Sequence, residues 1–125
     1  MKKIIETKNA SAPIGPYSQA VLSGNTLYTS GQIAMDPITG SLIMESIEAE
    51  TTQVMKNMKA VLTEAGMTFE HVIKSSIFIS DMDNFSKINA VYNQYFTSDY
   101  PARETVEVAR LPKDVNVEIS MIAVK

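Results

Sequence analysis

Near its end the chain reads Pro101-Ala-Arg-Glu-Thr-Val-Glu-Val-Ala-Arg-Leu-Pro-Lys-Asp-Val-Asn-Val-Glu-Ile-Ser-Met-Ile-Ala-Val124. Apolar residues fall on alternate positions at both ends of this stretch, and the Leu-Pro-Lys-Asp between them is typical of a turn. We therefore predict two β-strands joined by a turn, each with one apolar face. The apolar positions are Ala102, Val106 and Val108 on the first strand, and Val115, Val117, Ile119, Met121 and Ala123 on the second.

The opposite faces of these two predicted strands are polar or mixed. They carry Arg103, Thr105 and Glu107 on the first strand, and Asn116, Glu118, Ser120, Ile122 and Val124 on the second. Because apolar residues beside Glu118 gain nothing by facing water, we expect a partner subunit to cover this face. Arg103 and Glu118 would then lie at the rim or inside of a cleft, where a guanidinium can bind a carboxylate and a carboxylate can handle protons. The alternative is a cross-strand ion pair on a solvated surface.

Length and composition favour one folded domain over residues 1–125. The chain has 125 residues, 45% of them hydrophobic and 20% charged, which suits a single globular core. A net charge of -3 and a pI of about 5.1 argue against a broad basic surface, so a nucleic-acid partner is not expected. With no signal peptide and no apolar run long enough to span a membrane, we expect a cytoplasmic protein without membrane contact.

The rest of the chain predicts further strands and two helices. Strands are expected at Ile4–Thr7, in a hairpin over Ala20–Ser30, and at Val72–Ser80. Apolar residues at three- and four-residue spacing predict amphipathic helices at Ile47–Ala65 and Phe85–Phe96. The order β-β-β-α-β-α-β-β indicates an α+β domain of two layers.

Two loops are expected to deliver polar groups. Pro13 and Pro16 stiffen the loop that leads to Tyr17, and so would hold the tyrosine hydroxyl in place. In the predicted hairpin, strand alternation points Ser30 to the face opposite Leu27.

These motifs together resemble a known family. Ile14-Gly15-Pro16-Tyr17-Ser18-Gln19, Ser30-Gly31-Gln32-Ile33 and the stretch after Pro101 resemble the RidA/YjgF/YER057c/UK114 family of reactive-intermediate deaminases. The resemblance implies a chorismate-mutase-like fold, a mixed six-stranded sheet covered on one side by two helices. It also implies a homotrimer, in which three subunits associate through their sheets and clefts lie between neighbours.

The implied activity is hydrolysis of 2-imino acids and enamines, such as 2-iminobutanoate and 2-iminopropanoate, to 2-oxo acids and ammonia. Such a reaction needs a cation for the carboxylate, a group that handles water and protons, and polar groups that fix the imine, without a metal or organic cofactor. Arg103 suits the first role, Glu118 the second, and Tyr17 and Ser30 with groups near Gly31 and Thr105 the third. Asn89 matches a position that lines the cleft in relatives.

Two residues depart from the common family pattern. Thr105 stands where many relatives have cysteine, and Glu104 where many have serine. Alternation directs Glu104 away from the Arg103 face, so we expect the activity to survive. Two other functions stay open, a non-catalytic regulatory module that binds 2-oxo acids and an RNA-directed translation inhibitor or endoribonuclease. Glu118 argues against the former, and the acidic pI with a single histidine, His71, argues against the latter.

Overall fold

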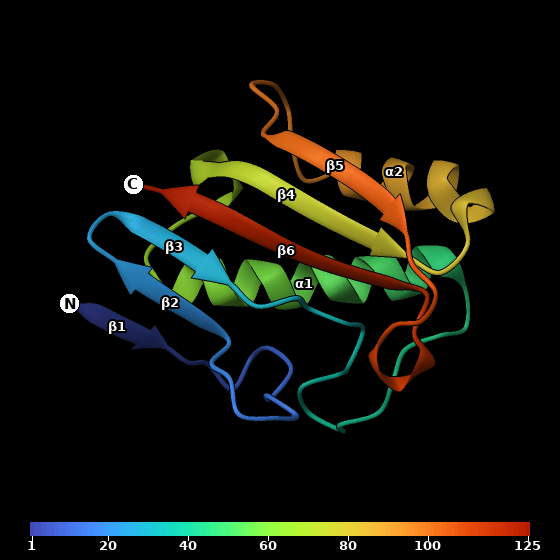
Figure 1. Ribbon diagram of the computed structural model, residues 1–125, viewed down its shortest axis with the longest axis horizontal. Coiled ribbons are helices and arrows are strands. Elements are labelled where there is room, and N and C mark those ends of the chain that lie inside the picture. The colour runs from blue at the N-terminus through green and yellow to red at the C-terminus, as the bar shows by residue number, and fades with distance from the viewer.

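Six strands form one mixed sheet in the computed structural model, which describes residues 1–125 (Figure 1). The strands are β1 (Lys2–Ile5), β2 (Ala20–Ser23), β3 (Thr26–Thr29), β4 (Val72–Ile79), β5 (Ala102–Glu107) and β6 (Val117–Val124). The two α-helices are α1 (Ile47–Glu64) and α2 (Phe85–Asn93), and short 3-10 turns cover Phe69–His71, Met82–Asn84 and Pro112–Asp114. The predicted order of strands and helices is confirmed.

The strands lie in the order β1-β2-β3-β6-β4-β5. β4 and β5 are parallel and joined through α2, whereas every other neighbouring pair is antiparallel. A parallel crossover places β5 at the edge of the sheet with β4 beside it, and β6 then pairs with the other side of β4. The expectation that Arg103 and Glu118 lie on neighbouring strands is therefore wrong, because β4 separates β5 from β6.

Both helices cover the same face of the sheet, which is the far face in Figure 1. The α1 helix begins where predicted, because the Ser46 hydroxyl accepts a hydrogen bond from the Ala49 N–H at 3.0 Å. It ends at Glu64, and Gly66 follows with a φ of +73°, a conformation that glycine adopts without strain. The α2 helix ends at Asn93, one turn earlier than predicted.

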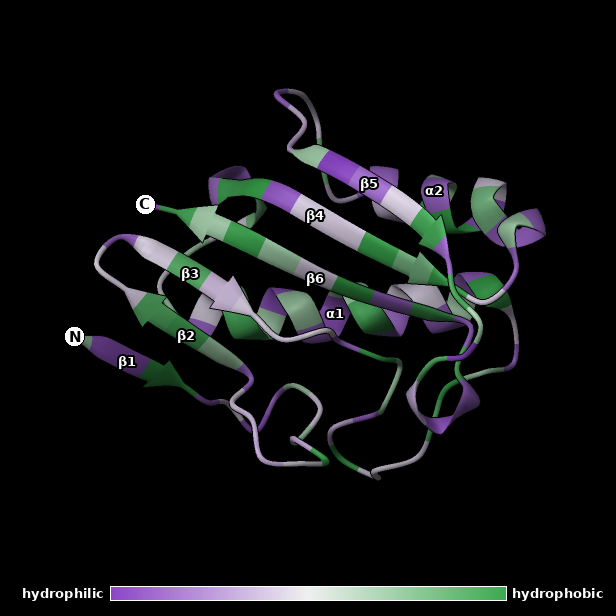
Figure 2. Ribbon diagram, in the orientation of Figure 1, coloured by the Kyte–Doolittle hydropathy of each residue, from purple (hydrophilic) through white to green (hydrophobic).

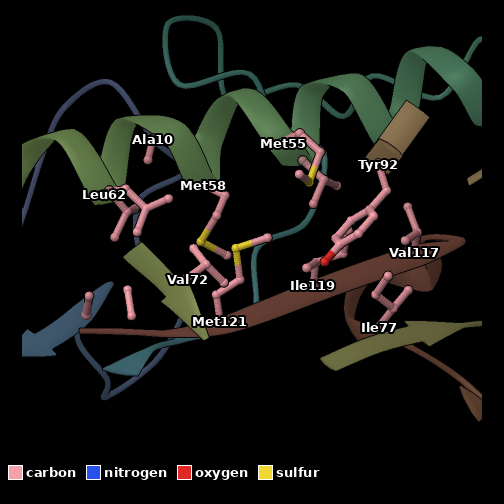
Figure 3. Packing of buried hydrophobic residues seen from close by; sticks show 14 of the residues in the cluster. Ala10, Met55, Met58, Leu62, Val72, Ile77, Tyr92, Val117, Ile119 and Met121 are labelled. Carbon is pink, nitrogen blue, oxygen red and sulfur yellow. The ribbon is translucent and has the colours of Figure 1, made fainter. Parts of the chain in front are cut away.

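The core fills the space between α1 and the sheet. The α1 side chains of Met55, Met58 and Leu62 point towards the sheet, where they meet Ile119 and Met121 of β6 (Figure 3). The alternate residues of β6 from Val117 to Ala123 are all buried, as the apolar spacing predicts. Hydropathy alternates along the first part of β6 in Figure 2, whereas its last four residues are all hydrophobic.

The other face of the sheet carries no helix and faces the viewer in Figure 1. Register places Tyr28, Ile122, Phe78 and Val106 on this open face, and Tyr28 and Val106 are 51% and 40% exposed. An uncovered apolar face of this kind is typical of an association surface. None of the helices has the length and hydropathy of a membrane-spanning segment.

Candidate functional site

Arg103 lies on the helix-covered side of β5, below α2. Its Nη1 donates to the Asn89 side-chain oxygen at 2.8 Å, and its guanidinium carbon lies 5.0 Å from the centre of the Tyr92 ring and 5.8 Å from that of Phe85. Aromatic rings attract a guanidinium through their negatively charged faces. The helix thus holds the guanidinium in one orientation and leaves its remaining N–H donors for a ligand.

Tyr92 forms a rigid support for Arg103. It is 4% exposed, and its hydroxyl donates to the hydroxyl of the buried Ser75 at 2.9 Å. Burial raises the pKa of Tyr92, against the opposing effects of the Ser75 hydrogen bond and the Arg103 charge. The phenol therefore stays neutral at physiological pH.

Thr105 follows Arg103 on the same face, because Ser75 pairs with Arg103 and Ile77 pairs with Thr105. The Thr105 hydroxyl is buried and has no hydrogen-bond partner in the chain. It lines a narrow hollow with Arg103, Asn89 and the apolar residues Ile77, Ile79, Phe85 and Ile88. An open hollow of about 260 Å³ adjoins it on the other side of Arg103, towards Tyr100. We call Arg103, Asn89, Tyr92 and Thr105 the Arg103 cluster.

Glu118 lies on the open face of the sheet, where its register partner on β4 is Phe78. Its carboxyl group packs against Gly31, since a Cβ atom built there would lie 2.6 Å from Glu118 Cδ. Burial raises the pKa of the half-buried Glu118, because the charged carboxylate loses contact with water. Glu118 is thus a carboxyl group with a raised pKa and no opposing cation within the chain.

Ser30 and Tyr17 lie on the segments around Gly31, the residue that the Glu118 carboxyl group contacts. The Ser30 hydroxyl donates to the Ser18 carbonyl at 2.5 Å, and its backbone N–H donates to the Gln19 carbonyl at 2.8 Å. The Tyr17 side chain is 47% exposed, and its hydroxyl accepts from the Ile14 N–H at 3.2 Å. Tyr17 and Gly31 line one small hollow. We call Glu118, Gly31, Ser30 and Tyr17 the Glu118 cluster.

Gln32 is a residue of this region to which the sequence interpretation assigned no role. It lines the hollow shared by Tyr17 and Gly31, is 3% exposed, and its side-chain oxygen has no hydrogen-bond partner in the chain. Its backbone exchanges hydrogen bonds with Ile119, the residue after Glu118. Its place in the Ser-Gly-Gln motif is the only sequence signal that could have marked it.

The two clusters lie on opposite faces of the sheet. Phe78 of β4 pairs with both Glu118 and Val106, whereas Arg103 pairs with Ser75, a residue on the other face. Ala102 and Val106 share one face as predicted, but the expectation that Arg103 shares a face with Glu118 is wrong, because Arg103 lies under α2. The predicted site residues form two groups in one chain rather than one cleft.

Glu104 and His71 lie apart from both clusters. As alternation predicts, Glu104 lies on the open face, where it contacts Lys74 at 2.7 Å and accepts a hydrogen bond from Ser76. His71 Nδ1 accepts from the Thr68 N–H at 3.0 Å and completes a turn. The largest hollow, about 580 Å³, lies between residues 6–13 and Pro37 and contains none of the predicted site residues.

Known proteins resemble this chain over its whole length. Residues 7–125 match the family model described as endoribonuclease L-PSP. A RutC family protein of Pyrococcus horikoshii is 50% identical over 125 residues, which cover 100% of this chain and 99% of that protein. The human 2-iminobutanoate/2-iminopropanoate deaminase is 42% identical, with coverage of 100% and 91%. The structure of Escherichia coli TdcF with bound serine matches with a TM-score of 0.94 at 44% identity, covering 98% of each chain.

Proposed function

Because the chain belongs to the endoribonuclease L-PSP family, which includes RidA and YjgF, we propose that it hydrolyses 2-imino acids such as 2-iminobutanoate and 2-iminopropanoate. Water adds to the imine carbon, the carbon–nitrogen bond breaks, and the products are a 2-oxo acid and ammonia. Two relatives that carry the deaminase name, human and bovine, are 42% and 46% identical to this chain. Their names support the activity.

Arg103 binds the substrate carboxylate. Its planar guanidinium can donate two parallel hydrogen bonds to one carboxylate, which a lysine cannot do. The Asn89 contact at 2.8 Å and the Tyr92 ring below it support this role, because they orient the guanidinium before the substrate arrives. The Thr105 hydroxyl lies on the same face of β5 as Arg103, buried and without a hydrogen-bond partner in the chain.

Glu118 handles the protons of the reaction. Its carboxylate takes a proton from the attacking water as the carbon–oxygen bond forms and gives it to the imine nitrogen. It then carries the proton of the new hydroxyl group to the same nitrogen, which leaves as ammonia while the carbonyl group of the 2-oxo acid forms. A pKa raised by burial brings this group closer to the operating pH, which favours proton transfer in both directions. In this proposal the Tyr17 and Ser30 hydroxyls and the backbone at Gly31 fix the imine nitrogen and the water.

Three copies of the chain assemble through their open sheet faces in this proposal. Because β5 is an edge strand, the Arg103 cluster lies at the rim of the sheet, and the proposal sets this rim of one copy against the Glu118 cluster of its neighbour across a shared cleft. Two observations support this arrangement. The open face exposes Tyr28 and Val106, which association would cover. The two clusters lie on opposite faces of one sheet, so a cleft with both needs residues from two chains.

The observation that carries the proposal is the sheltered Glu118 carboxyl group. A regulatory module that only binds 2-oxo acids gains nothing from a second negative group near its ligand, whereas hydrolysis requires one. An RNA-directed function has less support, because the pI is about 5.1 and His71 is engaged in a turn with Thr68.

The test couples a threonine or serine dehydratase to the purified protein and follows semicarbazide trapping of the imine. The wild-type protein should reduce the trapped imine in proportion to its concentration, and Arg103→Lys and Glu118→Gln should not. Lys87→Ala, an exposed change on the same helix as Asn89, is the matched control and should act as the wild type. No reduction at any protein concentration would reject the deaminase and favour the binding module.

A further inference from the structure

Glu50 is a buried carboxylate that belongs to neither cluster. It lies in the first turns of α1 and is 0% exposed. Its Oε2 accepts from the backbone N–H groups of Asn116 and Val117 at 2.8 and 3.2 Å, and its Oε1 accepts from the Asn116 side-chain nitrogen at 2.8 Å. A buried carboxylate that loses such donors is left unsatisfied at a high cost in free energy. The three donors therefore fix Glu50 and its partners in one geometry.

The residues that Glu50 binds directly precede Glu118. β6 begins at Val117, so Glu118 is near the strand end, where hydrogen bonding is usually weakest. Asn116 is also tied to the end of β4, because its carbonyl accepts from the Ser80 N–H at 3.0 Å and its side-chain oxygen accepts from the Ser80 hydroxyl at 3.2 Å. Glu50 thus anchors the strand end that carries Glu118.

The same helix anchors the other side of the Glu118 cluster. Asn57, two turns further along α1 and 0% exposed, donates to the carbonyls of Ile33 and Met35 at 3.0 and 2.9 Å. These carbonyls follow Gly31 by two and four residues. Gln53 lies between the two anchors on α1 and donates to the Asn57 side-chain oxygen at 2.9 Å. One polar row of α1 therefore holds both segments that meet at Glu118 and Gly31.

We propose that Glu50, supported by Asn57, is a positioning residue for Glu118. It sets the distance between the Glu118 carboxyl group and the Gly31 backbone. These two groups are in close contact, because a Cβ atom on residue 31 would lie 2.6 Å from Glu118 Cδ. The inference rests on the proposed deaminase, in which Glu118 must meet both water and the imine nitrogen. A displacement of about 1 Å at such a group can cost about 10²-fold in rate.

Glu50→Gln tests the proposal in kinetics. The substitution keeps the size of the side chain but sets an NH₂ group among N–H donors, so at least one hydrogen bond to Asn116 or Val117 is lost. We expect kcat to fall about 10- to 10²-fold with KM within about twofold, because Arg103 lies on the other face of the sheet. Thr51→Val is the matched control. Thr51 is equally buried on α1 but bonds only to the Ile47 carbonyl of its own helix, so its kcat should stay unchanged.

A second measurement does not depend on catalysis. Carboxyl carbon NMR, with the Glu118 signal assigned from Glu118→Gln, follows the titration of Glu118 directly. We expect its midpoint to be above the ordinary glutamate range in the wild type and Thr51→Val, and to move down in Glu50→Gln as the group becomes more hydrated. Absence of imine hydrolysis in the wild type would reject the proposed function but leave this titration readable.

Asn116→Ala is the second variant, for the case that Glu50→Gln does not fold. It removes the side-chain contact to Glu50 and leaves the carboxylate its two backbone donors, so the Glu118 midpoint should move in the same direction by a smaller amount. An unchanged midpoint in whichever of the two variants folds would overturn the role of Glu50.

Discussion

Gly31 and the Glu118 side chain are packed so closely that a Cβ atom on residue 31 would meet Glu118 Cδ at 2.6 Å and Glu118 Oε2 at 2.7 Å. Both values are below any ordinary contact between carbon and these atoms. The absence of a side chain at position 31 is therefore what gives the Glu118 carboxyl group its place.

Gly31→Ala should displace Glu118 and lower kcat about 10²-fold, while the chain still folds because the clash is with a movable side chain. Steady-state kinetics and a thermal melt check this. Gly40→Ala is the control, since nothing lies within 4 Å of its Cβ position. It should lower stability through its φ of +75° and leave kcat unchanged. Full activity in Gly31→Ala would remove Glu118 in this conformation from the mechanism.

Two inactive variants should restore one another. In a ring of three copies, a cleft shared by neighbours needs an intact Glu118 from one chain and an intact Arg103 from the next. Refolding Arg103→Ala and Glu118→Gln chains together in equal amounts should therefore rebuild about one quarter of the wild-type sites. The coupled imine assay measures the recovery, with each variant refolded alone as the control. No recovery in assembled mixtures would mean that each site uses a single chain.

In an Arg103→Ala background, which removes the guanidinium that faces Glu118 in the proposed assembly, Glu118→Gln should stabilise the protein at neutral pH. Burial raises the pKa of Glu118 in the folded state above its value in the unfolded state. The favourable contribution of Glu118 to the free energy of unfolding is therefore present below the unfolded-state pKa, and it is lost as pH rises through the folded-state pKa. The amide of the Glu118→Gln variant stays neutral at every pH, so the variant does not lose this stability as pH rises. Thermal melts should show a higher Tm for the variant at pH 7 and nearly equal values below about pH 4. A lower Tm for the variant at pH 7 would contradict the burial effect.

The acid side of the pH–rate profile should report the same group. If the Glu118 carboxylate accepts the proton of water, kcat/KM falls as pH decreases through its raised pKa, so the midpoint should lie above the ordinary glutamate value of 4.5. Profiles measured with the dehydratase in excess at every pH check this. A rate independent of pH down to 4.5 would exclude Glu118 as the base.

Asn89→Ala should weaken substrate binding more than catalysis. The amide oxygen orients Arg103 through the 2.8 Å hydrogen bond but lies away from Glu118, so KM should rise about tenfold with a smaller change in kcat. The exposed Lys87→Ala is the control on the same helix. A fall in kcat at constant KM would place Asn89 in the chemical step instead.

Residue alternation and helical spacing predicted most of the strands and helices of this fold. They did not predict which face of β5 packs under the helices. The 3.6-residue spacing identified α1, and the period of two in β6 identified its buried face, because both elements are packed on the core along their length. In β5 the same period separated Arg103 from Val106 but did not determine which of the two faces packs under the helices. The open face is itself apolar at Val106, while the Arg103 side chain lies against Tyr92 and Phe85 on the covered face.

Contacts between distant segments could not be predicted from local patterns. The position of β4 between the last two strands depends on the crossover through α2, so the two strands that carry Arg103 and Glu118 were predicted while their mutual arrangement was not. The contacts of Glu50 and Asn57 link α1 to residues up to 67 positions away in the sequence, and no spacing rule connects them. Only Gly31 carried a local signal, as a glycine directly after a strand.

Because one face of the sheet is uncovered, the stability of the folded chain should depend on protein concentration. If assembly covers Tyr28 and Val106, the apparent melting temperature should rise with protein concentration, because association binds only the folded form. Dilution would then lower the proposed activity in two ways, first by separating the chains that share each proposed site and then by lowering the stability of the separated chains.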